Sequence, residues 1–136
     1  MSVDAVYVDS SVFVEAALEM GPARDSAERF LRDLEDEKLT AVTAALTVDE
    51  ILWAIKRTEG RKAAVDAACS LLACPALSIL SVDKSLVMRA VDVFANEGLD
   101  PRDAIHVAAM RSKGIKRIVS LDTDFDKVKG IVRVRV

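Results

Sequence analysis

The alternation of short apolar runs with helical patterns is the feature that most constrains the fold of this chain. Apolar, β-prone runs occur at about residues 4–8, 39–43, 77–82, 116–121 and 131–136. Between the first four runs, apolar residues recur at three- and four-residue spacing, which is typical of helices. Strands that alternate with helices predict an α/β fold with a small parallel sheet of four to five strands flanked by helices.

Capping and breaking residues set the expected helix boundaries. Helices are expected over about residues 11–20, 22–37, 61–73, 83–97 and 100–113, with one more that opens at Thr47–Glu50 and ends near Gly60. Ser10 or Ser11 is expected to cap the first helix, and the Thr47–Glu50 segment reads as a capping box. In the last apolar run Arg133 and Arg135 alternate with valines, which predicts a half-exposed edge strand.

Helical spacing also predicts which side chains are buried. Ala27, Phe30, Leu31 and Leu34 share one face, and Trp53 and Phe94 fit core stripes of their own helices. Two cysteines, Cys69 and Cys74, are too few for a disulfide framework, so we expect them to be small buried hydrophobes.

Composition excludes several classes of protein. A chain of 136 residues with 51% hydrophobic content fits one domain over residues 1–136. The formal net charge of −3 argues against a basic nucleic-acid coat protein, although an acidic metal pocket would lower the net charge of a nuclease as well. No run approaches the ~18 apolar residues of a membrane span, and the N-terminus lacks a signal-type pattern, so a cytoplasmic location is expected.

Four acidic residues sit where an α/β sheet gathers its functional groups. Asp9 and Asp122 each follow an apolar run, and Glu50 and Asp103 lie near the starts of expected helices. Because the carboxyl ends of parallel strands meet at one edge, we expect these side chains to converge. Asp124 is held in reserve as a fifth acid. Carboxylate oxygens suit a hard divalent cation, so the pattern favours a Mg²⁺- or Mn²⁺-dependent phosphodiesterase.

Other polar residues near the acids have weaker signals. Ser10, Ser120 and Thr123 flank the acids and are expected to support the carboxylates or metal-bound waters. His106 follows Asp103 by one helical turn, but no partner side chain is evident for it, so it borders either the pocket or the core. Taken one at a time, each acid also has an ordinary explanation as a helix cap or turn residue.

With these residues in hand, the sequence resembles the PIN-domain ribonucleases, in particular the VapC-type toxins of bacterial and archaeal toxin–antitoxin pairs. The resemblance rests on four segments and spans essentially the whole chain: residues 6–12, 47–51, 103–109 and 119–126. They correspond in order to the family's four acidic motifs, with Asp9, Glu50, Asp103 and Asp122 as the catalytic and metal-binding acids. The resemblance implies a three-layer α/β/α fold and metal-dependent cleavage of single-stranded RNA, with a homodimer and a small antitoxin as partners.

The resemblance leaves the RNA target open, and it leaves two other classes of function to be tested. Basic residues that are candidates for RNA contact are Lys56, Arg57, Lys84, Arg102, Arg111 and Lys113. A PIN-like module that binds RNA or protein without cutting, or a stand-alone RNA-processing nuclease, is the alternative. A phosphotransfer receiver domain fits less well, because Asp9 has no acidic neighbour and Lys116 is poorly placed against Asp122.

Overall fold

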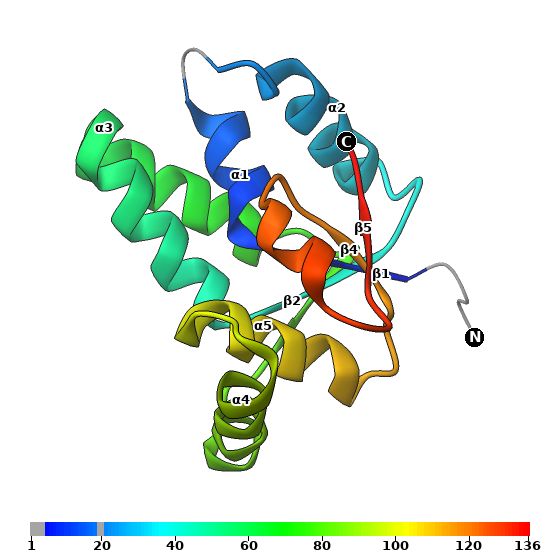
Figure 1. Ribbon diagram of the computed structural model, residues 1–136. Coiled ribbons are helices and arrows are strands. Elements are labelled where there is room, and N and C mark those ends of the chain that lie inside the picture. Colours follow the sequence, from blue (N-terminus) through cyan, green and yellow to red (C-terminus); the bar gives the residue numbers. More distant parts are fainter. Residues whose placement is uncertain (1–4, 19–20) are drawn as a thin grey trace.

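The computed structural model describes residues 5–18 and 21–136. Strands and helices alternate along the chain as the sequence predicts (Figure 1). The elements, in chain order, are β1 (Val6–Val8), α1 (Ser10–Ala17), α2 (Arg24–Glu35), β2 (Ala41–Ala44), α3 (Leu46–Leu72), β3 (Leu77–Leu80), α4 (Lys84–Glu97), α5 (Pro101–Ser112), β4 (Arg117–Val119), the 3₁₀ helix η1 (Thr123–Lys127) and β5 (Val132–Val134).

The strands form one parallel sheet in the order β3-β2-β1-β4-β5. This confirms the predicted α/β class and places β5 at an edge, as its alternating arginines predict. The central strand β1 is buried along its whole length, in keeping with a parallel sheet that helices cover on both faces.

Each face of the sheet has its own hydrophobic core, because side chains alternate along a strand. Val6 and Val8 of β1 pack against α1, α2 and α3, whereas Tyr7 packs with α4, α5 and η1 on the other face. Figure 1 shows the first three helices on one side of the strands and α4 and α5 on the other. The result is a three-layer α/β/α arrangement, and Ala27 and Leu34 of α2 are buried within it as predicted.

Two helix starts differ from the sequence prediction. The cap of α1 is Asp9 rather than Ser10 or Ser11, and its carboxylate accepts the backbone N–H of Ser11. The Thr47–Glu50 segment is not a capping box, because α3 begins at Leu46 and its cap residue makes no side-chain hydrogen bond. Thr47 is instead buried, and its hydroxyl pairs with that of Thr43 at 2.7 Å.

The predicted burials of Trp53, Phe94 and Cys69 are also wrong. Trp53 and Phe94 are 52% and 50% exposed, because the buried stripes of α3 and α4 follow other residues, such as Ile51 and Ile55. Cys69 is exposed and Cys74 is half-buried, and both are free thiols. Within the described part of the chain, no helix combines the length and the apolarity that a bilayer crossing requires.

Gly60 divides α3 into two helical segments, close to the point at which the sequence predicts a helix end. Its backbone has φ 89° and ψ 173°, a conformation that is essentially restricted to glycine. Nothing lies within 4 Å of a Cβ built at this position, so any cost of a side chain there comes from the backbone alone.

We therefore expect Gly60→Ala to lower the free energy of unfolding by about 1–3 kcal/mol, the typical cost of such a conformation in a non-glycine residue. Urea-induced unfolding followed by circular dichroism measures the change. Thr58→Ala, an exposed substitution on the same helix, serves as the control and should shift stability by no more than about 0.5 kcal/mol. Equal stability of Gly60→Ala and the unmodified protein would contradict this account of the bend.

Candidate active site

The strand order creates a crevice at the carboxyl end of β1. The chain leaves β1 toward β2 on one side and later crosses back to place β4 on the other side. Parallel sheets bind ligands outside the carboxyl ends of strands at such a switch point. The two strand ends are joined there by a 3.3 Å hydrogen bond from the Asp9 N–H to the carbonyl of Val119.

Asp9 is fixed in this crevice by two serine hydroxyls. The Ser11 hydroxyl donates to Oδ1 at 2.7 Å, and the Ser120 hydroxyl donates to Oδ2 at 2.9 Å. Each hydroxyl also accepts a backbone N–H from the segment after β4, Ser11 from Leu121 and Ser120 from Asp122. The serines thus tie Asp9 to the loop that carries the next acids.

Burial dominates the electrostatics of Asp9, which is only 5% exposed. Loss of solvent raises the pKa of this carboxyl, and the charge of Glu50 raises it further. The hydrogen bonds from Ser11 and Ser120 and the nearby His106 act in the opposite direction but do not cancel the effect of burial. A cation in the crevice would therefore be strongly favoured by this group.

Three other carboxylates converge from two segments. Asp103 lies in the first turn of α5, and Asp122 and Asp124 lie at the start of η1. One oxygen from each of the three lies within 4.8 Å of the other two. The Asp122 side chain also caps η1 by accepting the N–H of Asp124 at 2.9 Å, which fixes the spacing between these two acids.

Crowding is most evident at Asp103. Burial, followed by the negative charges of Asp122, Asp9 and Asp124, raises the pKa of Asp103 from 3.8 to about 6, against the opposing effect of His106. Like charges this close disfavour simultaneous ionisation unless a cation is present. Because the charge of Asp9 contributes to the raised pKa of Asp103, the clustered acids and Asp9 face one crevice.

Glu50 reaches the site through a buried histidine. Its Oε1 lies 2.6 Å from Nε2 of His106, and Nδ1 of that ring lies 2.6 Å from the Tyr7 hydroxyl. Both Tyr7 and His106 are buried, and their rings meet edge to face at 5.6 Å. Burial raises the pKa of Tyr7, which keeps its proton. A Tyr7 O–H that donates to Nδ1 and an Nε2–H that donates to Glu50 satisfy the whole chain of contacts.

The structure thus brings the predicted acids to one edge of the sheet but divides them into groups. Asp103, Asp122 and the reserve acid Asp124 form the tight cluster. Asp9 faces the same crevice and is hydrogen-bonded to Ser11 and Ser120, whereas Glu50 contacts His106. The donor chemistry of the cluster, three carboxylates with further oxygens nearby, fits a hard divalent cation.

Sequence reasoning missed two residues at the site. His106 was assigned no partner, but the partners Tyr7 and Glu50 lie 99 and 56 residues away in the sequence, where no local pattern reveals them. Ser11 takes the supporting place next to Asp9 that was expected for Ser10, whose hydroxyl makes no hydrogen bond within the described residues. A serine two residues after an N-cap aspartate is a signal that could have identified it.

The loop after β4 is braced by the edge strand. The Arg133 guanidinium of β5 donates to both carboxylate oxygens of Asp126, at 2.8 and 3.1 Å, and to the carbonyl of Ser120 at 3.2 Å. Only 10% of the Arg133 side chain is exposed. Arg133 therefore holds both ends of the segment from Ser120 to Asp126, and this segment bears Asp122 and Asp124.

The candidate RNA-contacting residues are spread over the surface. Arg102 precedes Asp103 directly, and Lys56 and Arg57 follow Glu50 by two turns of α3. Arg111 is bound to Glu97 by two hydrogen bonds of 2.6 and 2.8 Å, and it lies about 12 Å further along α5 than Asp103. Lys113 follows the end of the same helix, and Lys84 opens α4. Of these six candidates, Arg102, Lys56 and Arg57 are thus the nearest to the acids in sequence.

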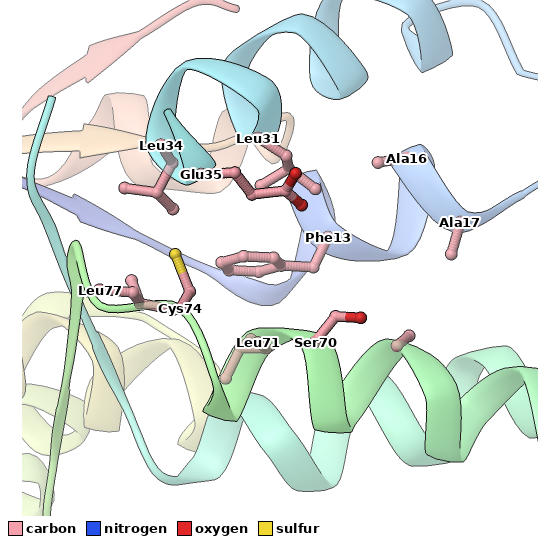
Figure 2. Close-up of a pocket in the computed structure, with 11 residues that line it drawn as sticks. Phe13, Ala16, Ala17, Leu31, Leu34, Glu35, Ser70, Leu71, Cys74 and Leu77 are labelled. Atoms are coloured by element: carbon pink, nitrogen blue, oxygen red, sulfur yellow. The ribbon is translucent and has the colours of Figure 1, made fainter. Parts of the chain in front are cut away.

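An apolar recess adjoins the second half of α1. It has a volume of about 160 Å³ and lies between α1, α2 and α3 (Figure 2). Its lining is mostly apolar, with Phe13, Leu31 and Leu71 among the larger side chains and Glu35 at its margin. None of the clustered acids lines the recess, so its lining offers apolar contacts and no groups for metal chemistry.

The sequence is similar to proteins that are named VapC ribonucleases. Ribonuclease VapC13 of Mycobacterium tuberculosis is 30% identical over 133 residues, which cover 95% of this chain and 98% of that protein. Ribonuclease VapC23 of the same species is 30% identical over 118 residues, which cover 86% of this chain and 92% of that protein.

Solved structures share the fold at lower identity. The crystal structure of VapC20 of M. tuberculosis, described as a sarcin–ricin loop cleaving toxin, matches with a TM-score of 0.78 at 22% identity and covers 89% of this chain and 92% of that chain. VapBC2 from Rickettsia felis, bound to a DNA fragment from its promoter, matches with a TM-score of 0.72 at 10% identity, covering 96% and 98%.

The family model of the PIN domain matches residues 6–131, which include all of the acids described above. The chain therefore belongs to the PIN-domain family, and VapC ribonucleases are among its relatives.

Proposed function

We propose that this protein is a Mg²⁺- or Mn²⁺-dependent endoribonuclease and the toxin of a toxin–antitoxin pair. The observation on which the proposal depends is the cluster of Asp103, Asp122 and Asp124 beside the buried Asp9. The relatives support the reaction class, since they are named ribonucleases and one similar structure is described as a sarcin–ricin loop cleaving toxin.

The carboxylates would have different roles in binding a cation. Asp103, Asp122 and Asp124 would supply ligand oxygens, and Asp9 would add negative charge from a fixed position behind them. A bound divalent cation would lower the pKa of an attacking water and stabilise charge on the cleaved phosphodiester. The hydroxyls of Ser11 and Ser120 keep Asp9 aimed at the crevice, so they act as positioning groups.

Glu50 and His106 form a second unit within the same site. With Nδ1 held by Tyr7, the imidazole can turn only one ring nitrogen toward Glu50. This fixes the carboxylate of Glu50 at the rim of the crevice, where its side chain is 13% exposed. Glu50 is therefore placed to orient a water or a ligand, while His106 acts through it.

An antitoxin is the partner that the toxin assignment implies. Similar structures include toxin–antitoxin complexes, such as one from Klebsiella pneumoniae. The apolar recess of Figure 2 suits the apolar side chains of a docking segment, and Phe13 on its wall lies one helical turn from the Asp9 cap. A segment bound there would pack against α1, which follows Asp9, and against α3, which carries Glu50.

A homodimer is the second assembly that we propose. Four apolar side chains of α4 are 40–62% exposed: Val87, Met88, Val91 and Phe94. Three of them, Val87, Val91 and Phe94, border an apolar hollow together with Pro101 and Ile105. Clustered exposed apolar groups mark interaction surfaces, and a patch on one helix is suited to a twofold contact between identical copies.

Replacing Asp103 with Asn should reduce RNA cleavage by a factor on the order of 100 or more, because one charged ligand of the cluster is lost. The folded state should persist, since the change also removes like-charge repulsion. Cleavage of a labelled single-stranded RNA with added Mn²⁺ measures the activity, and calorimetric titration with Mn²⁺ measures the metal site. Asp66→Asn, a surface acid on α3, is the control. Full activity in a folded Asp103→Asn protein would refute the assignment, and absence of a metal site in the unmodified protein would favour a non-cutting module.

Metal affinity should rise with pH, because Asp103 must lose its proton to bind a cation. Its folded-state pKa of about 6 exceeds the ordinary value of 3.8, so ionisation between about pH 4 and 6 lowers the stability of the metal-free protein. Between about pH 5 and about pH 7 the affinity for Mn²⁺ should increase about tenfold and then level off. Calorimetry in buffers of different ionisation enthalpy should detect the released proton. A constant affinity across this range would contradict the protonated state of the cluster.

Placing a charge on the exposed apolar surface of α4 should dissociate the proposed homodimer. Phe94→Glu places a charge in the apolar hollow, and we expect the protein to change from dimer to monomer in size-exclusion chromatography with light scattering. Val65→Glu, at an equally exposed apolar residue on α3, should leave the dimer intact. A monomeric unmodified protein, or a dimer that survives Phe94→Glu, would show that α4 is not the interface.

A further inference from the structure

Trp53 lies on the surface at the edge of the candidate active site. It is the single tryptophan of the chain and is 52% exposed. It follows Glu50 by three residues on α3, so the two side chains lie one turn apart on neighbouring positions of the helix surface. The buried stripe of the same segment, Ile51 and Ile55, points to the core instead. Neither packing nor the core explains the large aromatic side chain at this position.

The indole ring of Trp53 makes a cation–π contact with Arg57. The guanidinium carbon of Arg57 lies 4.5 Å from the centroid of the Trp53 ring, in a cation–π contact. Arg57 makes no ion pair with any residue that the structure describes, and Lys56 stands next to it on the exposed surface. The contact covers part of the ring and restricts its rotation, while half of the residue's surface stays open to solvent.

The surroundings separate this surface from the proposed dimer contact. The exposed apolar residues of α4 have no stacked cation among the residues that the structure describes, and Val87, Val91 and Phe94 among them line a hollow that is separate from Trp53. Around Trp53, one acid of the site (Glu50), an aromatic plane and two cations follow one another along a short length of α3. Cations complement a phosphate backbone, and a flat aromatic ring complements a nucleobase.

We infer that Trp53, held by Arg57, is a stacking platform for a base of the RNA that the site cleaves. The inference rests on the proposed ribonuclease function and names how the substrate is held. Single-stranded RNA exposes the faces of its bases, which stack on aromatic side chains in a sequence-tolerant way. With a phosphate at the acids, a base of a nearby nucleotide would lie against the indole, and Arg57 and Lys56 would face the backbone.

The single tryptophan allows a direct test by fluorescence. In the Asp103→Asn protein, which should not cut RNA, short oligouridylate and oligoadenylate RNAs should quench the Trp53 emission in a saturable manner. An abasic oligomer with the same number of phosphates should bind through charge alone and quench little. Equal quenching by the abasic oligomer, or no quenching by either RNA, would overturn the platform.

Substitutions separate this inference from the nuclease assignment. In the otherwise unmodified protein, Trp53→Ala should raise KM for RNA about tenfold or more while kcat changes little, because the base lies away from the reacting phosphate. Trp53→Phe should restore most of the affinity, and this variant also controls for misfolding of Trp53→Ala. Leu72→Ala, which removes an exposed apolar side chain at the other end of α3, should have no effect.

The two proposals fail in different ways. Cleavage by the unmodified protein with an unchanged KM in Trp53→Ala would overturn the platform and leave the nuclease standing. Base-dependent quenching in a protein that cuts no RNA with any divalent metal would support the platform and refute the nuclease.

Discussion

Asp9 is held at the end of the central strand by the hydroxyls of Ser11 and Ser120, which in turn accept backbone N–H groups of the loop after β4. These hydrogen bonds join the carboxyl ends of β1 and β4, the point at which the strand order reverses. They fix a buried carboxylate next to a loop that bears two more acids. Without them, repulsion among the carboxylates would push the loop away from the strand, and no crevice for a cation would persist.

Support for this arrangement comes from both faces of the sheet. On one side, Tyr7 and His106 hold Glu50 through a buried chain of contacts. On the other side of the loop, Arg133 binds both Asp126 and the carbonyl of Ser120. Thr43 adds a further brace, since its hydroxyl donates to the carbonyl of Val8 just before Asp9. The acids are thus placed by strands, helices and a clamped loop rather than by flexible segments, which suits a preorganised site.

Much of this fold can be predicted from the sequence, because parallel strands and amphipathic helices leave local patterns. The role of β5 as an edge strand follows from the same patterns, but the strand order does not, because it depends on pairing between segments that are distant in sequence. The convergence of Asp103 and Asp122 follows from strand ends and helix starts, but the separation of Glu50 from the tight cluster does not. That separation depends on His106, whose partners are distant in sequence. The exposure of Trp53 was likewise missed, because helical spacing identifies a stripe but not which of two adjacent stripes faces the core.

The hydrogen bond between Ser120 and Asp9 joins residues 111 positions apart, and Tyr7 and His106 are separated by 99. Contacts of such long sequence separation form late in folding, because a large loop must close before they are made. During synthesis, one edge of β1 has no strand to pair with until β4 has been synthesised. A nascent chain therefore has no complete acidic crevice until synthesis has passed Asp124, so the order of translation delays the appearance of the site.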